Sequence, residues 1–156
     1  MQDDTKTNKL VRYISMMLFL ISLTQKAYCT TDSCSDSFLV FLLGWAAAFT
    51  SFAGTSWLAN PLLILSWILL GKKLKLAMLL CVGAFILALS FLLAGEVTAN
   101  ENGQQHQIVS RNAGYWLWLT SMLVMVFGTF WLQLKENTQK FHEQRKQDQQ
   151  STNYLH

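Results

Sequence analysis

Residues 38–70 read FLVFLLGWAAAFTSFAGTSWLANPLLILSWILL and contain no Asp, Glu, Lys, Arg or His. As one straight α-helix this stretch would reach about 50 Å, whereas the hydrocarbon core of a bilayer is about 30 Å thick. The stretches 76–95 and 113–132 also carry no charged residue, and both exceed the roughly 18 apolar residues that a membrane-spanning helix needs. The sequence therefore predicts an integral membrane protein of helical type.

The composition also indicates lipid rather than water as the surrounding medium. Apolar residues make up 52% of the chain and charged residues 13%, against about a quarter in soluble domains. The net charge is +3, and the basic residues form short clusters beside the apolar stretches. Such clusters are typical of topology signals, so the charge does not indicate a nucleic-acid partner.

The 38–70 stretch has two candidate break points, the small and helix-neutral residues Gly54-Thr55-Ser56 and the pair Asn60-Pro61, which carries the clearer signal. Pro61 has no N–H to bond to the carbonyl of Trp57, and the residue before a proline is disfavoured in helical dihedrals. Asn60 as N-cap with Pro61 at the first helical position is a coherent start signal for a second helix. We expect one helix over about 38–52, an irregular stretch, and a second helix from Pro61 to Leu70.

These segments predict an all-α membrane protein, a bundle of four transmembrane helices of which the second is broken near Asn60-Pro61. The single transmembrane domain covers residues 1–134, with spans at about 10–28, 38–70, 76–95 and 113–134. Residues 135–156 are rich in Gln and Lys, and we expect a polar cytoplasmic tail that is disordered or at most a frayed helical extension. Residues 1–29 leave two readings open, since the first apolar run also has the length of a signal-peptide core.

The positions of Lys and Arg favour this topology over one with five spans. With both termini inside and one net crossing by residues 38–70, ten of the twelve Lys and Arg residues lie inside. If residues 38–70 instead cross twice as a hairpin, the best orientation places eight inside and four outside. The distribution therefore favours a multi-pass protein of a bacterial inner membrane with both termini cytoplasmic.

Cys29 and Cys34 lie in one polar loop. In this topology the loop faces an oxidising compartment, where the two cysteines could form a disulfide. His106 has no second His or Cys at ligand spacing, so we expect no metal site, and no motif indicates a cofactor.

Four tryptophans lie near the ends of the expected spans: Trp67, Trp116, Trp118 and Trp131. Aromatic residues are enriched at both membrane interfaces because their rings are apolar while their N–H or O–H groups reach water. We therefore expect these four to form interface belts.

Two stretches, WLANP at residues 57–61 and GYWLWL at residues 114–119, stand out within the apolar part of the chain. They resemble stretches of a group of small, uncharacterised bacterial multi-pass membrane proteins, and the likeness covers roughly residues 10–128. The resemblance implies a prokaryotic inner-membrane location. It implies no activity, so no functional residue is transferred.

No Ser-His-Asp order, phosphate-cradling glycine loop or pair of carboxylates at membrane depth is found, so we expect no enzyme. The leading hypothesis is a non-enzymatic protein that acts through helix–helix or protein contacts, as an accessory subunit, a scaffold or an immunity-type protein. Its partners would be the lipid bilayer and another membrane protein or a second copy. The alternative is a small carrier or channel for an uncharged solute that uses the Asn60-Pro61 helix break.

Overall fold

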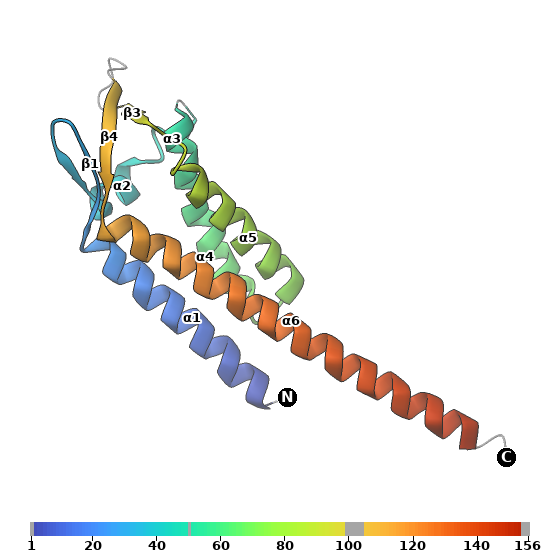
Figure 1. The fold of residues 1–156 in the computed structure, drawn as a ribbon. Coiled ribbons are helices and arrows are strands. Elements are labelled where there is room, and N and C mark those ends of the chain that lie inside the picture. Colours follow the sequence, from blue (N-terminus) through green and yellow to red (C-terminus); the bar gives the residue numbers. More distant parts are fainter. Residues whose placement is uncertain (1, 50, 99–104, 154–156) are drawn as a thin grey trace.

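The computed structural model describes residues 2–49, 51–98 and 105–153. Its elements are α1 (Gln2–Leu23), β1 (Lys26–Thr30), β2 (Cys34–Asp36), α2 (Ser37–Leu43), α3 (Phe52–Thr55), the 3-10 helix η1 (Ser56–Leu58), α4 (Ala59–Leu69), α5 (Leu74–Ser90), β3 (Glu96–Thr98), β4 (Gln105–Arg111) and α6 (Ala113–Asn153) (Figure 1). The long helices lie side by side, and the strands gather at one end of them.

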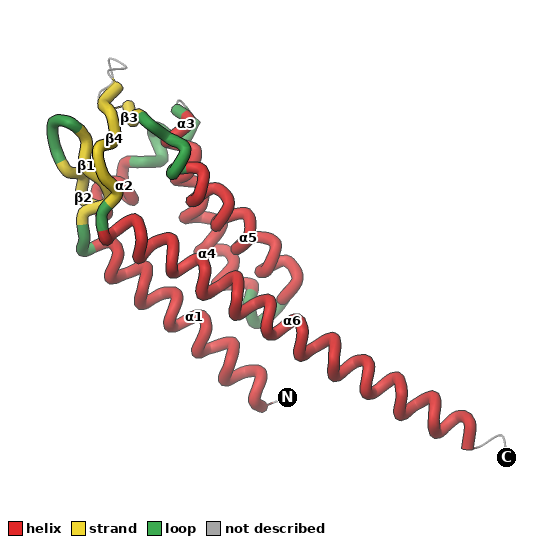
Figure 2. Tube along the Cα trace, viewed as in Figure 1, coloured by secondary structure: helices red, strands yellow, loops and turns green. Residues whose placement is uncertain are grey.

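The helices pack in the spatial order α1, α6, α5 and α4. Their contact surfaces meet in a core of small and apolar residues, of which Leu63, Ala77, Cys81, Met122 and Met125 are fully buried. The start of α1 and the end of α6 both lie away from the strands (Figure 2). The molecule therefore has a sheet end and an opposite end that holds both chain ends.

The strands form one antiparallel sheet in the order β2-β1-β4-β3. Strand β1 follows α1 after a short turn, and β4 leads directly into α6. Because α1 and α6 lie side by side, β1 and β4 meet as neighbours, with Tyr28 opposite Arg111 and Cys29 opposite Ser110. The pairing of β1 with β4 gives the backbone N–H and C=O groups of both segments hydrogen-bond partners. In two separate loops these groups would have to bond to water.

The expected all-α bundle of four transmembrane helices is therefore wrong. The chain contains a four-stranded antiparallel sheet, and the described residues hold two helical stretches long and apolar enough to cross a membrane, Phe52–Leu69 and Ala113–Gln150. Helix α5 is shorter than a full span, and α1 begins in a polar segment. Loops that we expected to be irregular pair as strands because the helices that carry them are packed together.

The 38–70 stretch is divided into separate pieces, and α4 begins at Ala59, directly before Asn60-Pro61. The 3-10 helix η1 precedes α4, and a wider interruption lies between Leu43 and Phe52. Ser51 begins the second helical piece as its N-cap, since its Oγ accepts a hydrogen bond from the Gly54 N–H at 3.0 Å. A serine cap satisfies one of the backbone donors that every helix start leaves free.

Residues 135–153, expected to be disordered or frayed, continue α6 to Asn153. Gln, Lys and Glu are good helix formers, and extending an existing helix avoids the cost of a new nucleus. The pair Lys140–Glu136 and the Arg145 guanidinium over the Phe141 ring add contacts along this extension.

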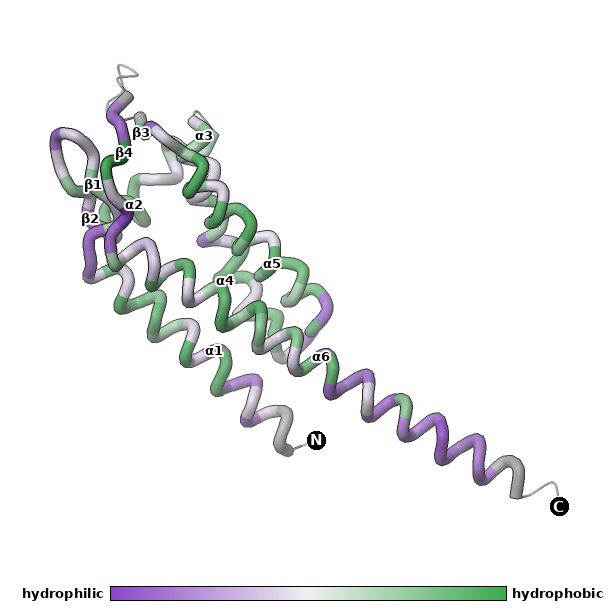
Figure 3. Tube along the Cα trace, in the orientation of Figure 1, coloured by the Kyte–Doolittle hydropathy of each residue, from purple (hydrophilic) through white to green (hydrophobic). Residues whose placement is uncertain are grey.

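Hydropathy divides the molecule along its length (Figure 3). The middle of the helices is hydrophobic, whereas much of the sheet, the turn between α4 and α5 and the far half of α6 are hydrophilic. The apolar part of α6 ends at Leu134, where Lys135 begins the polar extension.

Candidate functional site

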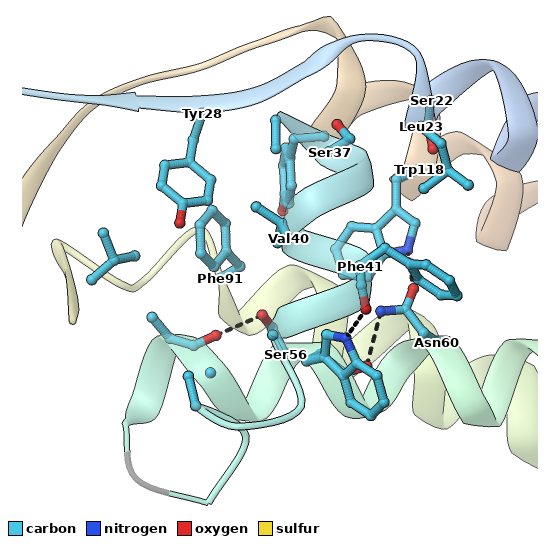
Figure 4. Close-up of a pocket in the computed structure, with 18 of the residues that line it drawn as sticks. Ser22, Leu23, Tyr28, Ser37, Val40, Phe41, Ser56, Asn60, Phe91 and Trp118 are labelled. Atoms are coloured by element: carbon cyan, nitrogen blue, oxygen red, sulfur yellow. Dashed lines mark hydrogen bonds between the residues drawn. The ribbon is translucent and has the colours of Figure 1, made fainter. Parts of the chain in front are cut away.

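A cavity of about 130 Å³ lies where the sheet end meets the helices, and it is partly open to the outside (Figure 4). Nearly every element contributes to its wall. The lining residues are Phe19, Ser22, Leu23, Ala27, Tyr28, Ser37, Val40, Phe41, Gly44, Ala47, Ser51, Ala53, Gly54, Ser56, Trp57, Asn60, Phe91, Val97, Tyr115 and Trp118. None of these described residues is Asp, Glu, Lys, Arg, His or Cys, so the lining carries no permanent charge.

Trp57 joins the α2 wall to the following helix. Its indole Nε1 donates to the carbonyl oxygen of Phe41 at 2.8 Å, beyond the interruption in the helix. Gly44 makes this approach possible, because a Cβ there would lie 2.5 Å from Cδ1 of Trp57. The glycine and the indole together position α2 beside the cavity.

Asn60 lies with Pro61 in the first turn of α4, directly after the 3-10 helix η1. Its Nδ2 donates to the Trp57 carbonyl oxygen at 3.0 Å, which is the acceptor that Pro61, lacking an N–H, cannot reach from the next turn. Its Oδ1 accepts from Trp118 Nε1 of α6 at 2.8 Å. Both polar atoms of the amide are therefore bonded within the protein, one repairing the helix and one joining it to α6.

Aromatic rings form the wall on the sheet side. Tyr28 lies against Phe91 and Phe91 against Tyr115, each with ring centroids 5.5 Å apart. The Tyr115 hydroxyl donates to the Ala88 carbonyl oxygen at 2.9 Å and so fixes α6 to the end of α5. The packed rings of these three residues, with the Tyr115 hydroxyl bonded to α5, present a largely apolar surface to the cavity.

Arg111 holds the end of α5 beneath this wall. Its guanidinium donates to the carbonyl oxygens of Phe91, Leu92 and Ala94 at 3.1, 2.8 and 2.9 Å. These carbonyls follow the last turn of the helix, where a positive charge is favourable because the helix dipole is negative there. The arginine that we counted as a topology signal is thus part of the packing between sheet and helices.

Ser37 is the lining residue whose hydroxyl has no hydrogen-bond partner, although the residue is only 8% exposed. It differs from Ser22 and Ser56, whose hydroxyls donate to the carbonyl oxygens of Phe19 and Ala53 at 2.6 and 2.7 Å. A buried polar atom without a partner is uncommon, because burial removes its bonds to water. The Ser37 Oγ lies close to Gly114, where an added Cβ would be 2.2 Å from it, so this hydroxyl is enclosed between α2 and the start of α6.

Of the four tryptophans expected at membrane interfaces, two are exposed and two face the protein interior. Trp116 and Trp131 are exposed, at 50% and 59%, whereas Trp67 is 6% exposed. Trp67 lies in the core and donates from Nε1 to the Ser15 hydroxyl at 3.0 Å, and Trp118 lines the cavity. Trp67 and Trp118 therefore face the protein and Trp116 and Trp131 face outward, and the depth of all four in a membrane stays a prediction.

Cys29 and Cys34 face each other across β1 and β2 and are joined by a disulfide. The Asn112 side chain donates to the Cys29 sulfur at 3.0 Å, which ties the bonded hairpin to the start of α6. His106 of β4 contacts the Asp32 carboxylate between β1 and β2. Within the described residues there is no group of three His, Cys, Asp or Glu that could hold a metal ion.

Sequence reasoning missed the cavity and most of its wall. Tyr28, Phe41 and Phe91 belong to three separate segments, and no spacing or motif relates them. An uncharged aromatic cavity can hold an apolar group, and its few polar atoms are nearly all bonded within the protein.

Comparison with known proteins identifies no relative: no family model, curated protein or solved structure matches the chain. The resemblance to uncharacterised bacterial membrane proteins stays a prediction. The cavity must therefore be interpreted from its own geometry.

Proposed function

We propose that the chain is a multi-pass protein of a bacterial inner membrane that acts without catalysis, through contacts with other membrane molecules. The observation that carries the proposal is the exposure of large apolar side chains over the middle of the helices, with charged residues confined to the two ends. Both termini would lie in the cytoplasm, and the sheet would lie on the opposite side.

Large apolar residues are exposed on every long helix. On α1 they include Leu10, Met17 and Leu20 at 60%, 58% and 57%, and on α6 Phe127 is 67% exposed. Soluble monomers rarely expose large continuous apolar patches, because water around them is unfavourable. Two helices are also long and apolar enough to cross a membrane, which supports lipid as the medium.

The distribution of charge supports the orientation. Lys6, Lys9 and the Lys72-Lys73 pair belong to the end of the molecule that holds both chain ends (Figure 1), and positive charge accumulates on the cytoplasmic side of membrane proteins. The Cys29–Cys34 disulfide lies at the sheet end, and disulfides persist in oxidising compartments such as the bacterial periplasm.

A contact function fits the cavity and the surface better than the carrier alternative does. The carrier hypothesis relies on free polar groups at the Asn60-Pro61 break, whereas the Asn60 amide is bonded to Trp57 and Trp118. The bonded amide therefore favours the contact function.

Thiol accessibility tests the proposal. Single cysteines at Ser33, Gly71, Gln107 and Gln150, all exposed, would be introduced into a chain in which the native cysteines are replaced by serine. We expect a membrane-impermeant maleimide to label Ser33→Cys and Gln107→Cys in sealed spheroplasts, and the other two after permeabilisation.

Two controls keep the result interpretable. The protein must remain in the membrane fraction after an alkaline carbonate wash, which releases peripheral proteins. Release by carbonate contradicts membrane insertion, and labelling of Gly71→Cys or Gln150→Cys in sealed spheroplasts contradicts the orientation.

A further inference from the structure

We propose that the cavity between the sheet and the helices binds a hydrocarbon chain of a membrane lipid. This inference rests on the proposed membrane location and adds a ligand class to it. It is carried by three observations: an uncharged lining, a volume suited to one chain segment, and a thin wall toward the surrounding lipid.

The lining selects against charged and strongly polar ligands. The indole N–H groups of Trp57 and Trp118 and the hydroxyl of Tyr115 are bonded to protein oxygens. A polar ligand would lose its bonds to water without gaining replacements here, whereas a hydrocarbon has none to lose. The aromatic rings of Tyr28 and Phe91 remain available for contact with an apolar chain.

The volume limits how much of a lipid can enter. Engineered cavities of about 150 Å³ lined by apolar side chains bind a molecule the size of benzene. The cavity of about 130 Å³ therefore takes a short segment of one chain rather than a whole lipid.

Helix α2 is the wall between the cavity and the exterior. Val40 and Phe41 line the cavity, while Leu39, Leu42 and Leu43 of the same helix are 50%, 47% and 65% exposed. In a bilayer these exposed leucines would contact lipid chains. One short helix thus separates the aromatic cavity from lipid of the same chemistry as the proposed ligand.

The test uses a photoreactive fatty acid with a diazirine near the end of its chain. The intact protein is reconstituted in vesicles of phosphatidylethanolamine and phosphatidylglycerol that contain this probe, irradiated, and mapped by mass spectrometry. We expect adducts at the lining residues Tyr28 and Phe91 in addition to adducts at the outward residues Trp116 and Phe127.

A matched pair of variants on α2 decides whether the adducts report the cavity. Val40→Phe places a ring in the cavity and is expected to reduce labelling of Tyr28 and Phe91 about tenfold, because the ring occupies the volume of the chain. Leu39→Phe adds the same ring on the exposed face and should change nothing. Labelling of Trp116 and Phe127 should be equal in all three proteins.

Each other outcome overturns a defined claim. Adducts at Trp116 and Phe127 alone would overturn the cavity proposal and leave the membrane location standing, whereas no adduct anywhere would contradict the membrane location itself. Unchanged labelling of Tyr28 and Phe91 in Val40→Phe would also overturn the cavity proposal. If Val40→Phe fails to match the wild-type circular dichroism, Val97→Phe fills the cavity from β3 and takes its place.

Discussion

The middle of the helices and the sheet end are both rich in hydrogen bonds, yet one is closely packed and the other contains a cavity. In the middle, Trp67 of α4 donates to Ser15 of α1, and Ser15 donates to the Ser121 carbonyl oxygen of α6 at 2.8 Å. At the sheet end, Trp118 of α6 donates to Asn60 of α4. Polar pairing alone therefore does not decide how closely the helices pack.

The difference lies in the size of the neighbouring side chains. Ser15 and Ala84 are fully buried where the helices are close, and Gly128 contacts Val11 so closely that a Cβ would lie 2.3 Å from its Cγ1. At the sheet end, large rings span the gap between elements instead. Small side chains allow two helices to pack closely. Aromatic side chains that form a hydrogen bond at one edge keep the neighbouring helices further apart, and a cavity remains beside the ring.

The largest effect is expected at Gly114, where the sheet end is tight. A Cβ there would lie 2.2 Å from the Ser37 Oγ and 2.6 Å from the Lys26 carbonyl oxygen, and the backbone atom cannot yield. Gly114→Ala should lower the free energy of unfolding by about 3 kcal/mol, measured by thermal unfolding in mild detergent.

Gly83→Ala is the matched control for this substitution. No atom lies within 4 Å of the position of its Cβ. The change should leave stability unaltered or raise it by about 1 kcal/mol, because Ala is the better helix former. If Gly114→Ala and Gly83→Ala lowered the free energy of unfolding equally, the sheet end would not be tightly packed around Gly114.

Asn60→Leu should produce the next largest effect. It leaves the Trp118 N–H without a partner and removes the Asn60 bond to the Trp57 carbonyl oxygen, at an expected cost of about 2 kcal/mol in the free energy of unfolding. The double variant Asn60→Leu/Pro61→Ala should recover part of this loss, because the new N–H at position 61 can bond to the Trp57 carbonyl. Absence of any recovery would contradict the role assigned to the Asn60 amide.

Ser15→Ala and Ser37→Ala should change the free energy of unfolding in opposite directions. Ser15→Ala removes the bonds to Trp67 and Ser121 and should cost about 1 kcal/mol in unfolding free energy. Ser37→Ala removes a buried hydroxyl that has no partner, so the lipid-free protein should become slightly more stable. Thermal unfolding in the same detergent compares the two, and destabilisation by both would show that Ser37 is bonded within the protein.

The sequence patterns predicted the positions of the helices better than they predicted the contacts between the helices. Uncharged stretches identified most of the helical segments, since apolar length is a local property. The sheet was missed because β1 and β4 are brought together by the packing of α1 on α6, with Cys29 and Asn112 separated by 83 positions. The hydrogen bond from Trp118 to Asn60 was missed for the same reason, because the two residues are 58 positions apart.

The smallest effect is expected on the polar extension of α6, beyond both compared regions. A hydrogen bond from Lys140 lowers the pKa of the Glu136 carboxyl, with a smaller contribution from the charge of Lys75 at the start of α5. Because the folded pKa is below the unfolded one, this stabilisation is present above the unfolded pKa and is lost as the pH falls through the folded pKa. Glu136→Gln should therefore reduce stability by a few tenths of a kcal/mol at neutral pH, as for other exposed pairs at this spacing, and by nothing once Glu136 is protonated. A double-mutant cycle with Lys140→Gln, followed by unfolding at both pH values, measures the pair directly. A coupling that persists at low pH would mean that packing of the side chains, rather than charge, joins them.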